Sequence, residues 1–98
     1  MQDWRVAGNV ASASFVTGSF AQGVIFVNVI GDIADEANHH PDVDLRYSFV
    51  EIRLTTHEIH ALSERDVSLA RDISAAAKEL GMAAKPATVS TDPNELEP

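Results

Sequence analysis

The sequence predicts an α+β domain with a four-stranded antiparallel sheet and two helices packed on one face. Short apolar runs near residues 4–7, 10–16 and 49–56 are typical of strands, whereas apolar residues recur at helical spacing over residues 19–38 and again after residue 63. The predicted order is strand, strand, helix, strand, strand, helix. Two helices on the same face of the sheet bury both apolar stripes in the simplest way.

Two short strands open the predicted fold. Between Val6 and Phe15, apolar residues alternate loosely with small or polar ones, as in strands with one buried face. Gly8 and Asn9 favour a turn, so the chain is expected to reverse between the two strands.

A capping box marks the start of the first predicted helix. Ser19 and Gln22 have the spacing at which two side chains satisfy free backbone N–H groups. The predicted apolar stripe consists of Phe20, Val24, Val27, Ile30, Ile33 and Ala37. Gly23 and Gly31 are expected where the helix packs closely against another element. Pro41 ends the helix, because a proline pushes the residue before it out of the helical conformation.

Two further strands are predicted after this helix. The apolar side of the alternation changes between Arg46 and Ser48, which indicates a turn or bulge there. In the strand that follows, Val50, Ile52 and Leu54 point together toward the core.

The second predicted helix begins at a pair that resembles a capping box, Ser63 and Asp66, and ends at Gly81. Its predicted apolar stripe consists of Val67, Ala70, Ile73, Ala77 and Leu80. Beyond it the pattern is lost: residues 85–98 are rich in Pro, Thr, Ser and acidic residues and are predicted to form a disordered tail or a linker. The folded domain is therefore expected to span residues 1–84.

Composition narrows the possible partners. The chain has 98 residues, enough for one domain, and a formal charge of −8, which disfavours direct binding to nucleic acid because phosphates repel it. It has no cysteine, so disulfides and cysteine-based zinc sites are excluded and a reducing, cytoplasmic location is expected. The longest apolar-rich stretch, residues 20–37, is too polar to span a bilayer, so no membrane association is predicted.

All four histidines lie between residues 39 and 60, and this grouping is the strongest functional signal in the sequence. Histidine can accept and donate protons near neutral pH, so His39, His40 and His57 are candidates for acid–base catalysis. His39 and His40 could instead be exposed residues at the end of a helix. His60 is expected to be exposed rather than functional, and Asp66 could simply cap a helix.

A metal site is a further alternative. The three candidate histidines, with Asp42 or Asp44, could supply nitrogen and oxygen ligands. Their spacing matches no zinc motif, and neighbouring histidines in an extended loop tend to diverge. No metal is therefore predicted.

One ordered motif runs from the end of the first helix to the start of the second. It consists of Asp35, His39-His40-Pro41, Tyr47, Thr56-His57 and Asp66. In this motif, and in the runs at 54–58 and 62–66, the chain resembles the pterin-4a-carbinolamine dehydratase family. The resemblance covers about residues 4–80.

The resemblance implies a reaction and a site. Members of the family dehydrate 4a-hydroxytetrahydropterin to quinonoid dihydropterin during tetrahydrobiopterin recycling, with no metal and no cofactor besides the pterin substrate. By resemblance, His39, His40 and His57 are the catalytic residues, and which of them is acid and which is base stays open. The implied substrate-binding residues are Asp35, Pro41, Thr56 and Asp66. Asp66 could instead orient a histidine, and Asp35 could support His39. A homodimer or homotetramer is also implied.

Three departures from the family favour an alternative function. Family members usually carry a helix before the first strand, whereas Trp4 stands near the start of this sequence. Val43 replaces a tryptophan that commonly follows the histidines. Ala61 replaces a glycine, which would strain the turn if that position needs a positive φ. The alternative is a catalytically weak, dehydratase-like module that binds a partner protein or assists its assembly.

Overall fold

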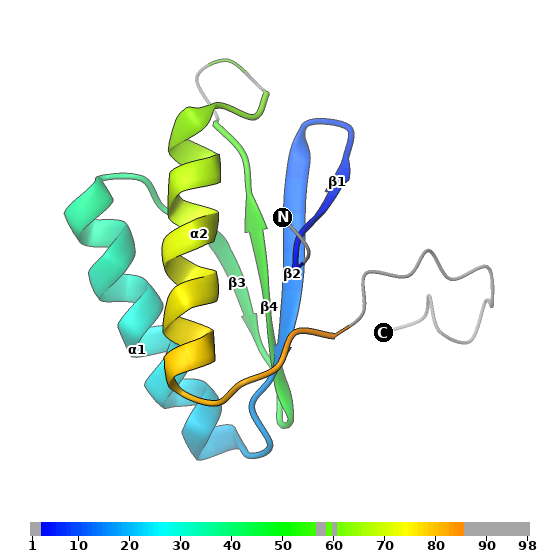
Figure 1. Cartoon of the computed structure of the whole chain (residues 1–98), viewed down its shortest axis with the longest axis vertical. Helices are drawn as coiled ribbons and strands as arrows, with labels where there is room; N and C mark the ends of the chain where they lie inside the picture. Colours follow the sequence, from blue (N-terminus) through cyan, green and yellow to red (C-terminus); the bar gives the residue numbers. More distant parts are fainter. Residues whose placement is uncertain (1–2, 57–58, 60, 86–98) are drawn as a thin grey trace, which may run out of the picture.

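The computed structural model describes residues 3–56, 59 and 61–85. It contains, in order, β1 (Arg5–Ala7), β2 (Val10–Val16), α1 (Phe20–Ala37), β3 (Asp42–Leu45), β4 (Phe49–Leu54) and α2 (Glu64–Glu79). The strands form one antiparallel sheet in the order β1-β2-β4-β3, and both helices cover the same face of it (Figure 1). The predicted fold class and the predicted order of elements are confirmed.

The core lies between the sheet and the two helices. Alternate residues of the central strands β2 and β4 point inward, as expected of strands with one covered face. The residues predicted to face the core from the last strand are buried: Val50, Ile52 and Leu54. Phe15 of β2 makes edge-to-face contacts with Trp4 and with Phe26 of α1, with ring centroids 6.3 and 5.5 Å apart. These aromatic contacts tie α1 to the central strand.

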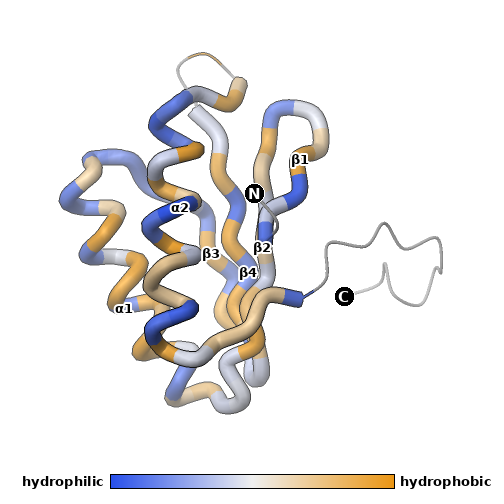
Figure 2. The backbone as a smooth tube through the Cα atoms, viewed as in Figure 1, coloured by the Kyte–Doolittle hydropathy of each residue, from blue (hydrophilic) through white to orange (hydrophobic). Residues whose placement is uncertain are grey.

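α1 buries a different stripe from the predicted one. Its buried residues are Gly23, Phe26, Ile30 and Ala34. Phe20 and Val24, which were predicted to face the core, are 50% and 39% exposed. The helix is hydrophobic over most of its length (Figure 2), so its periodicity fits more than one inward face. Gly23 lies on the face that packs, because a Cβ atom there would be 2.7 Å from Cδ1 of Leu45, whereas one at Gly31 would meet open space. The prediction of close packing is therefore right for Gly23 and wrong for Gly31.

α2 turns a carboxylate inward. Its buried residues are Asp66, Leu69, Ala70, Ile73 and Ala77. Val67 and Leu80, which were predicted to belong to the stripe, are 42% and 39% exposed. The stripe differs from the prediction because Asp66, which a hydropathy pattern assigns to the surface, has hydrogen-bond partners in the interior. The helix ends as predicted before Gly81, whose φ of 73° lies in the left-handed region.

The chain after α2 returns to the sheet. Residues 83–85 pair with the part of the β2 edge that β1 leaves free, and Lys85 N–H donates to Ser14 O at 2.8 Å. The rest of the predicted tail, residues 86–98, lies outside the described residues. No helix in the described part of the chain is both long and apolar enough to cross a membrane.

Candidate active site

A tight turn at the end of α1 carries the two neighbouring histidines. Asn38 ends the helix in the left-handed conformation, with φ 52° and ψ 41°, which asparagine adopts more readily than most residues. Its N–H donates to carbonyl oxygens of the last helical turn, and the N–H of His39 donates to Ala34 O at 3.2 Å. This turn holds His39 against the helix end, where its side chain is buried, and leaves His40 exposed.

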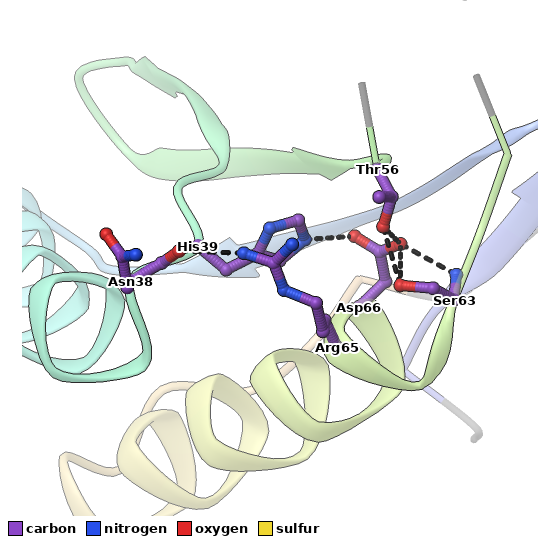
Figure 3. A network of polar contacts seen from close by, with 6 residues as sticks. All are labelled: Asn38, His39, Thr56, Ser63, Arg65 and Asp66. Carbon is purple, nitrogen blue, oxygen red and sulfur yellow. Dashed lines mark hydrogen bonds and ion pairs between the residues drawn. The ribbon is translucent and has the colours of Figure 1, made fainter. Parts of the chain in front are cut away.

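His39 is paired with Asp66, in the first turn of α2. Nε2 of the imidazole lies 2.6 Å from Oδ1 of the carboxylate, and the two side chains are 7% and 2% exposed. The pair joins the end of one helix to the start of the other (Figure 3). Because little water reaches it, the electrostatic attraction between the two groups is stronger than it would be at the surface.

Thr56 and Ser63 hold the other oxygen of Asp66. Oδ2 accepts hydrogen bonds from Thr56 Oγ1 at 2.7 Å and from Ser63 N–H at 2.9 Å (Figure 3). Burial alone would raise the pKa of the carboxyl, but hydrogen bonds from His39, Thr56 and the Ser63 backbone outweigh burial and keep that pKa below its ordinary value. Asp66 is therefore ionised at neutral pH, and both of its oxygens accept hydrogen bonds.

The backbone fixes the position of Thr56. Thr56 follows β4 and forms a bridge to Ala61, with its N–H donating to Ala61 O at 3.0 Å. Within residues 3–56, 59 and 61–85, Asn38 is the only non-glycine residue with a positive φ, so Ala61 has an ordinary backbone conformation. The alanine that replaces a glycine here does not strain the turn.

A second histidine–carboxylate pair lies at the surface. His40 Nε2 is 2.8 Å from Asp35 Oδ1, with side chains that are 57% and 78% exposed. The expectation that Asp35 supports His39 is therefore wrong, since its partner is His40. Arg65 of α2 donates from Nη2 to the carbonyl oxygen of Asn38 at 2.8 Å (Figure 3). α2 thus also holds the turn that carries the histidines.

The predicted site residues divide into two groups. His39, Thr56 and Asp66 come together in the interior, while His40 and Asp35 lie at the surface. Thr56 and Asp66 were expected to bind substrate, and in this structure their side chains bond to one another and to the site histidine. Contact of either residue with a substrate stays a prediction.

Pro41 and His57 complete the set of predicted site residues. Pro41 is partly buried, and His57, the third expected catalytic residue, lies outside the described residues. Sequence reasoning treated Ser63 only as a helix cap, although the same cap directs its N–H to Asp66. Sequence reasoning did not identify Arg65 as a residue of the site. The only sequence feature that could have pointed to Arg65 is its position next to Asp66. In the described part of the chain, no three histidine or acidic side chains gather closely enough to hold a metal ion.

Comparisons of the sequence with known proteins agree on one family. The family model for Pterin 4 alpha carbinolamine dehydratase matches residues 1–76. A relative from Thermomicrobium roseum, named "Putative pterin-4-alpha-carbinolamine dehydratase", is 39% identical over 71 residues, which are 72% of this chain and 76% of the relative. A relative of the same name from Sulfurisphaera tokodaii is 41% identical over 73 residues, or 74% of this chain and 78% of the relative.

Comparisons with solved structures agree on the fold. A transcriptional coactivator/pterin dehydratase from Brucella melitensis matches with a TM-score of 0.71 and 25% identity, covering 74% of this chain and 80% of the other. A pterin dehydratase-like protein, identified as a RuBisCO assembly factor in the alpha-carboxysome, matches with a TM-score of 0.63 and 21% identity, covering 78% and 88%. The second match, at this identity, bears on the fold alone.

Proposed function

The chain belongs to the pterin-4a-carbinolamine dehydratase family, and on that basis we propose that it dehydrates 4a-hydroxytetrahydropterin to quinonoid dihydropterin. The observation that carries the proposal is the buried pair of His39 and Asp66, two positions of the family motif that lie 2.6 Å apart. Acid–base catalysis requires a group that can exchange a proton and that is held in a fixed position. A histidine that is hydrogen-bonded to an ionised, buried carboxylate is such a group.

The reaction needs a base and an acid but no oxidation or reduction. The base removes the proton from the ring nitrogen next to carbon 4a. The C–O bond at carbon 4a then breaks as a C=N bond forms, and the acid protonates the departing hydroxyl to give water. The pterin is the substrate, so the proposed mechanism uses no further cofactor and no metal.

His39, His40 and His57 are the proposed catalytic residues. His39 and His40 are adjacent in sequence but differ in their surroundings, since one is buried beside Asp66 and the other is exposed beside Asp35. Ionisable groups in different environments suit the opposite roles of base and acid. His57 enters the proposal from its place in the sequence motif.

The four expected substrate-binding residues are proposed to act in two ways. Asp35 and Pro41 adjoin the exposed His40 and are proposed to contact the pterin directly. Thr56 and Asp66 are only 5% and 2% exposed, so their proposed role is exerted through the histidine that they hold.

Dehydration of freshly generated 4a-hydroxytetrahydropterin, followed by absorbance, tests the proposal. We expect a rate well above the spontaneous one, equal with and without a chelator. His39→Ala, His40→Ala and His57→Ala are each expected to lower kcat by about 10²- to 10⁴-fold. His60→Ala, which lies outside the motif, is the matched control. Full activity in His39→Ala and His57→Ala would refute the mechanism, and a chelator-sensitive rate would refute its independence of metal.

We further propose that the chain acts in the cytoplasm as a homodimer or homotetramer, as the family implies. A chain of 98 residues has a small core, and association is a common source of additional stability for such small proteins. Sedimentation velocity measures the association state. A monomer with full activity at micromolar concentration would contradict the proposal.

The alternative is a dehydratase-like module that assists another protein. Val43 favours it, because this residue packs against the core at a position where the family commonly has a tryptophan. The shared fold with a RuBisCO assembly factor is consistent with it. The dehydration assay separates the two functions: a folded protein that gives no acceleration supports the module, and acceleration lost in the histidine variants supports the enzyme.

A further inference from the structure

The hydrogen bonds around Asp66 leave one place for the ring hydrogen of neutral His39. Thr56 Oγ1 and Ser63 N–H both donate to Oδ2, at 2.7 and 2.9 Å. Oδ1 lies 2.6 Å from His39 Nε2, and the ionised carboxylate has no hydrogen to donate to it. A contact of this length between the two atoms therefore requires the hydrogen to be on Nε2.

We propose that this network holds His39 in the tautomer with hydrogen on Nε2, so that Nδ1 is the nitrogen that exchanges a proton with the substrate. Within the described ranges, Nδ1 has no hydrogen-bond partner. Thr56 and Ser63 are positioning residues, because they act on the histidine through Asp66. The reactive role of Nδ1 rests on the proposed function, whereas the tautomer is a property of the protein alone.

The Thr56 hydroxyl determines which groups donate and which accept in this hydrogen-bond network. A carboxylate can only accept, so the 2.7 Å contact with Asp66 Oδ2 uses the single hydrogen of Thr56. The Ser63 hydroxyl lies 2.6 Å from Thr56 Oγ1 and 3.4 Å from Asp66 Oδ2, and its hydrogen then serves the shorter contact with Thr56. The Thr56 backbone is held by the bridge to Ala61, and the Ser63 N–H can only donate. These donors therefore keep Oδ2 an acceptor and leave Asp66 an acceptor toward the histidine as well.

The surface pair provides an internal comparison. His40 and Asp35 make a similar contact, at 2.8 Å, but their side chains are 57% and 78% exposed. Water can replace either partner at such a site, so an exposed pair constrains its groups weakly. We expect the tautomer of His40 to be independent of the residue at position 35.

Asp66→Asn is the decisive variant. The Ser63 N–H can only donate and still needs an oxygen acceptor, so the amide oxygen takes the place of Oδ2 and the amide NH₂ faces His39. Nε2 must then accept a hydrogen bond, and the ring hydrogen moves to Nδ1. Asp35→Asn is the matched control, with the same chemical change at the exposed pair.

Nitrogen-15 NMR of the imidazole rings, at a pH where the histidines are neutral, distinguishes the two tautomers. We expect His39 to carry hydrogen on Nε2 in the wild type and on Nδ1 in Asp66→Asn, while Asp35→Asn leaves His40 unchanged. The backbone amide spectrum establishes that each variant is folded. Hydrogen on Nδ1 of wild-type His39, or on Nε2 in folded Asp66→Asn, would overturn the proposal. The wild-type spectrum alone decides if the variant does not fold.

Kinetics test the positioning role separately. Asp66→Asn is expected to lower kcat on the order of 10³- to 10⁴-fold, as expected when a catalytic imidazole is held in the wrong tautomer, with little change in KM. Thr56→Val is expected to lower kcat about 10- to 100-fold through the loss of one hydrogen bond to a charged group, and Thr56→Ser to restore it. A Thr56→Ser variant as slow as Thr56→Val would refute the role of Thr56.

A fixed tautomer in a protein without dehydratase activity would refute the proposed function and leave the tautomer assignment standing.

Discussion

At the scale of single residues, much of the site depends on Asp66. Its side chain is 2% exposed and yet ionised, because Thr56, His39 and the Ser63 backbone replace the water that it loses on folding. A buried carboxyl with fewer donors would have a raised pKa and would be neutral. The same hydrogen bonds that keep this group charged also contribute to the stability of the domain.

We expect Asp66→Ala to lower the free energy of unfolding at pH 7 by about 3 kcal/mol, because the buried His39 and Thr56 and the Ser63 N–H lose their acceptor. The folded-state pKa of Asp66 is lowered. Its ionised form therefore contributes stability above the unfolded-state pKa of about 3.9, and this contribution is lost as the pH falls through the folded-state pKa. The difference in unfolding free energy between wild type and variant should shrink below about pH 4. Urea titrations at pH 7 and pH 3 measure it, and an equal difference at both pH values would contradict the linkage.

The two adjacent histidines should differ in their effect on stability. His39→Ala leaves the Asp66 carboxylate without its imidazole partner in the interior, at an expected cost of about 1–3 kcal/mol in the free energy of unfolding. His40→Ala removes an exposed pair and is expected to change that free energy by no more than about 0.5 kcal/mol. Chemical unfolding of both variants is the measurement. Equal effects would be inconsistent with their different burial.

The sequence motif located the histidines and Asp66 but could not pair them. His39 and Asp66 are 27 residues apart, so their contact depends on how two helices pack, which no local pattern records. The resemblance to the family implied that Asp35 could support His39. The left-handed Asn38 ends the helix before the histidines, and Asp35 contacts His40 instead.

At the scale of elements, α1 offers a matched pair of glycine substitutions. Gly31→Ala adds a methyl group in open space and should stabilise the domain by up to about 1 kcal/mol through helix propensity. Gly23→Ala has the same propensity gain but places a Cβ 2.7 Å from Leu45 Cδ1, so the leucine side chain must move. We expect Gly23→Ala to be less stable than Gly31→Ala by about 1 kcal/mol or more, since overpacking typically costs that much. Thermal unfolding compares them, and equal stabilities would mean that Leu45 moves without cost.

Local signals explain why the elements could be predicted and their packing only in part. The capping residues Ser19 and Ser63 mark where both helices begin, and the alternation around Ile52 identifies a strand with one buried face. The inward face of α1 could not be read in the same way, because apolar residues surround much of the helix. The buried face of α2 differs from the predicted one, because a hydropathy pattern does not identify the charged Asp66 as a buried residue.

At the scale of the whole molecule, the site lies where α1 and β4 end and α2 begins. α1 contributes the turn with His39, the chain after β4 contributes Thr56, and the first turn of α2 contributes Asp66 (Figure 3). Each contact in this junction therefore depends on the complete fold. A ligand that binds there should stabilise the domain as a unit.

We expect a dihydropterin to raise the Tm of the protein, because a ligand that binds only the folded state stabilises it by about 2.7 kcal/mol at one hundred times its Kd. A purine with a similar bicyclic ring is the control and should give a smaller shift. His39→Ala is expected to reduce the response to the dihydropterin. Thermal unfolding at several ligand concentrations is the measurement, and equal shifts with both ligands would argue against a pterin site.

The edge of β2 has a mechanical consequence. The segment Arg5–Ala7 occupies one part of this edge and residues 83–85 the other, so the two ends of the described chain meet opposite the middle of the strand, near Ala13. A force on the C-terminal end would open the hydrogen bonds of residues 83–85 one after another, as in a zipper, rather than loading them together in shear. The N-terminal end is held more firmly, because Trp4 is buried in the core and its indole N–H donates to Ser74 Oγ. Residues 83–85 are therefore expected to detach from β2 at low force, and a processive unfolding machine would meet less resistance at its first step from the C-terminal side.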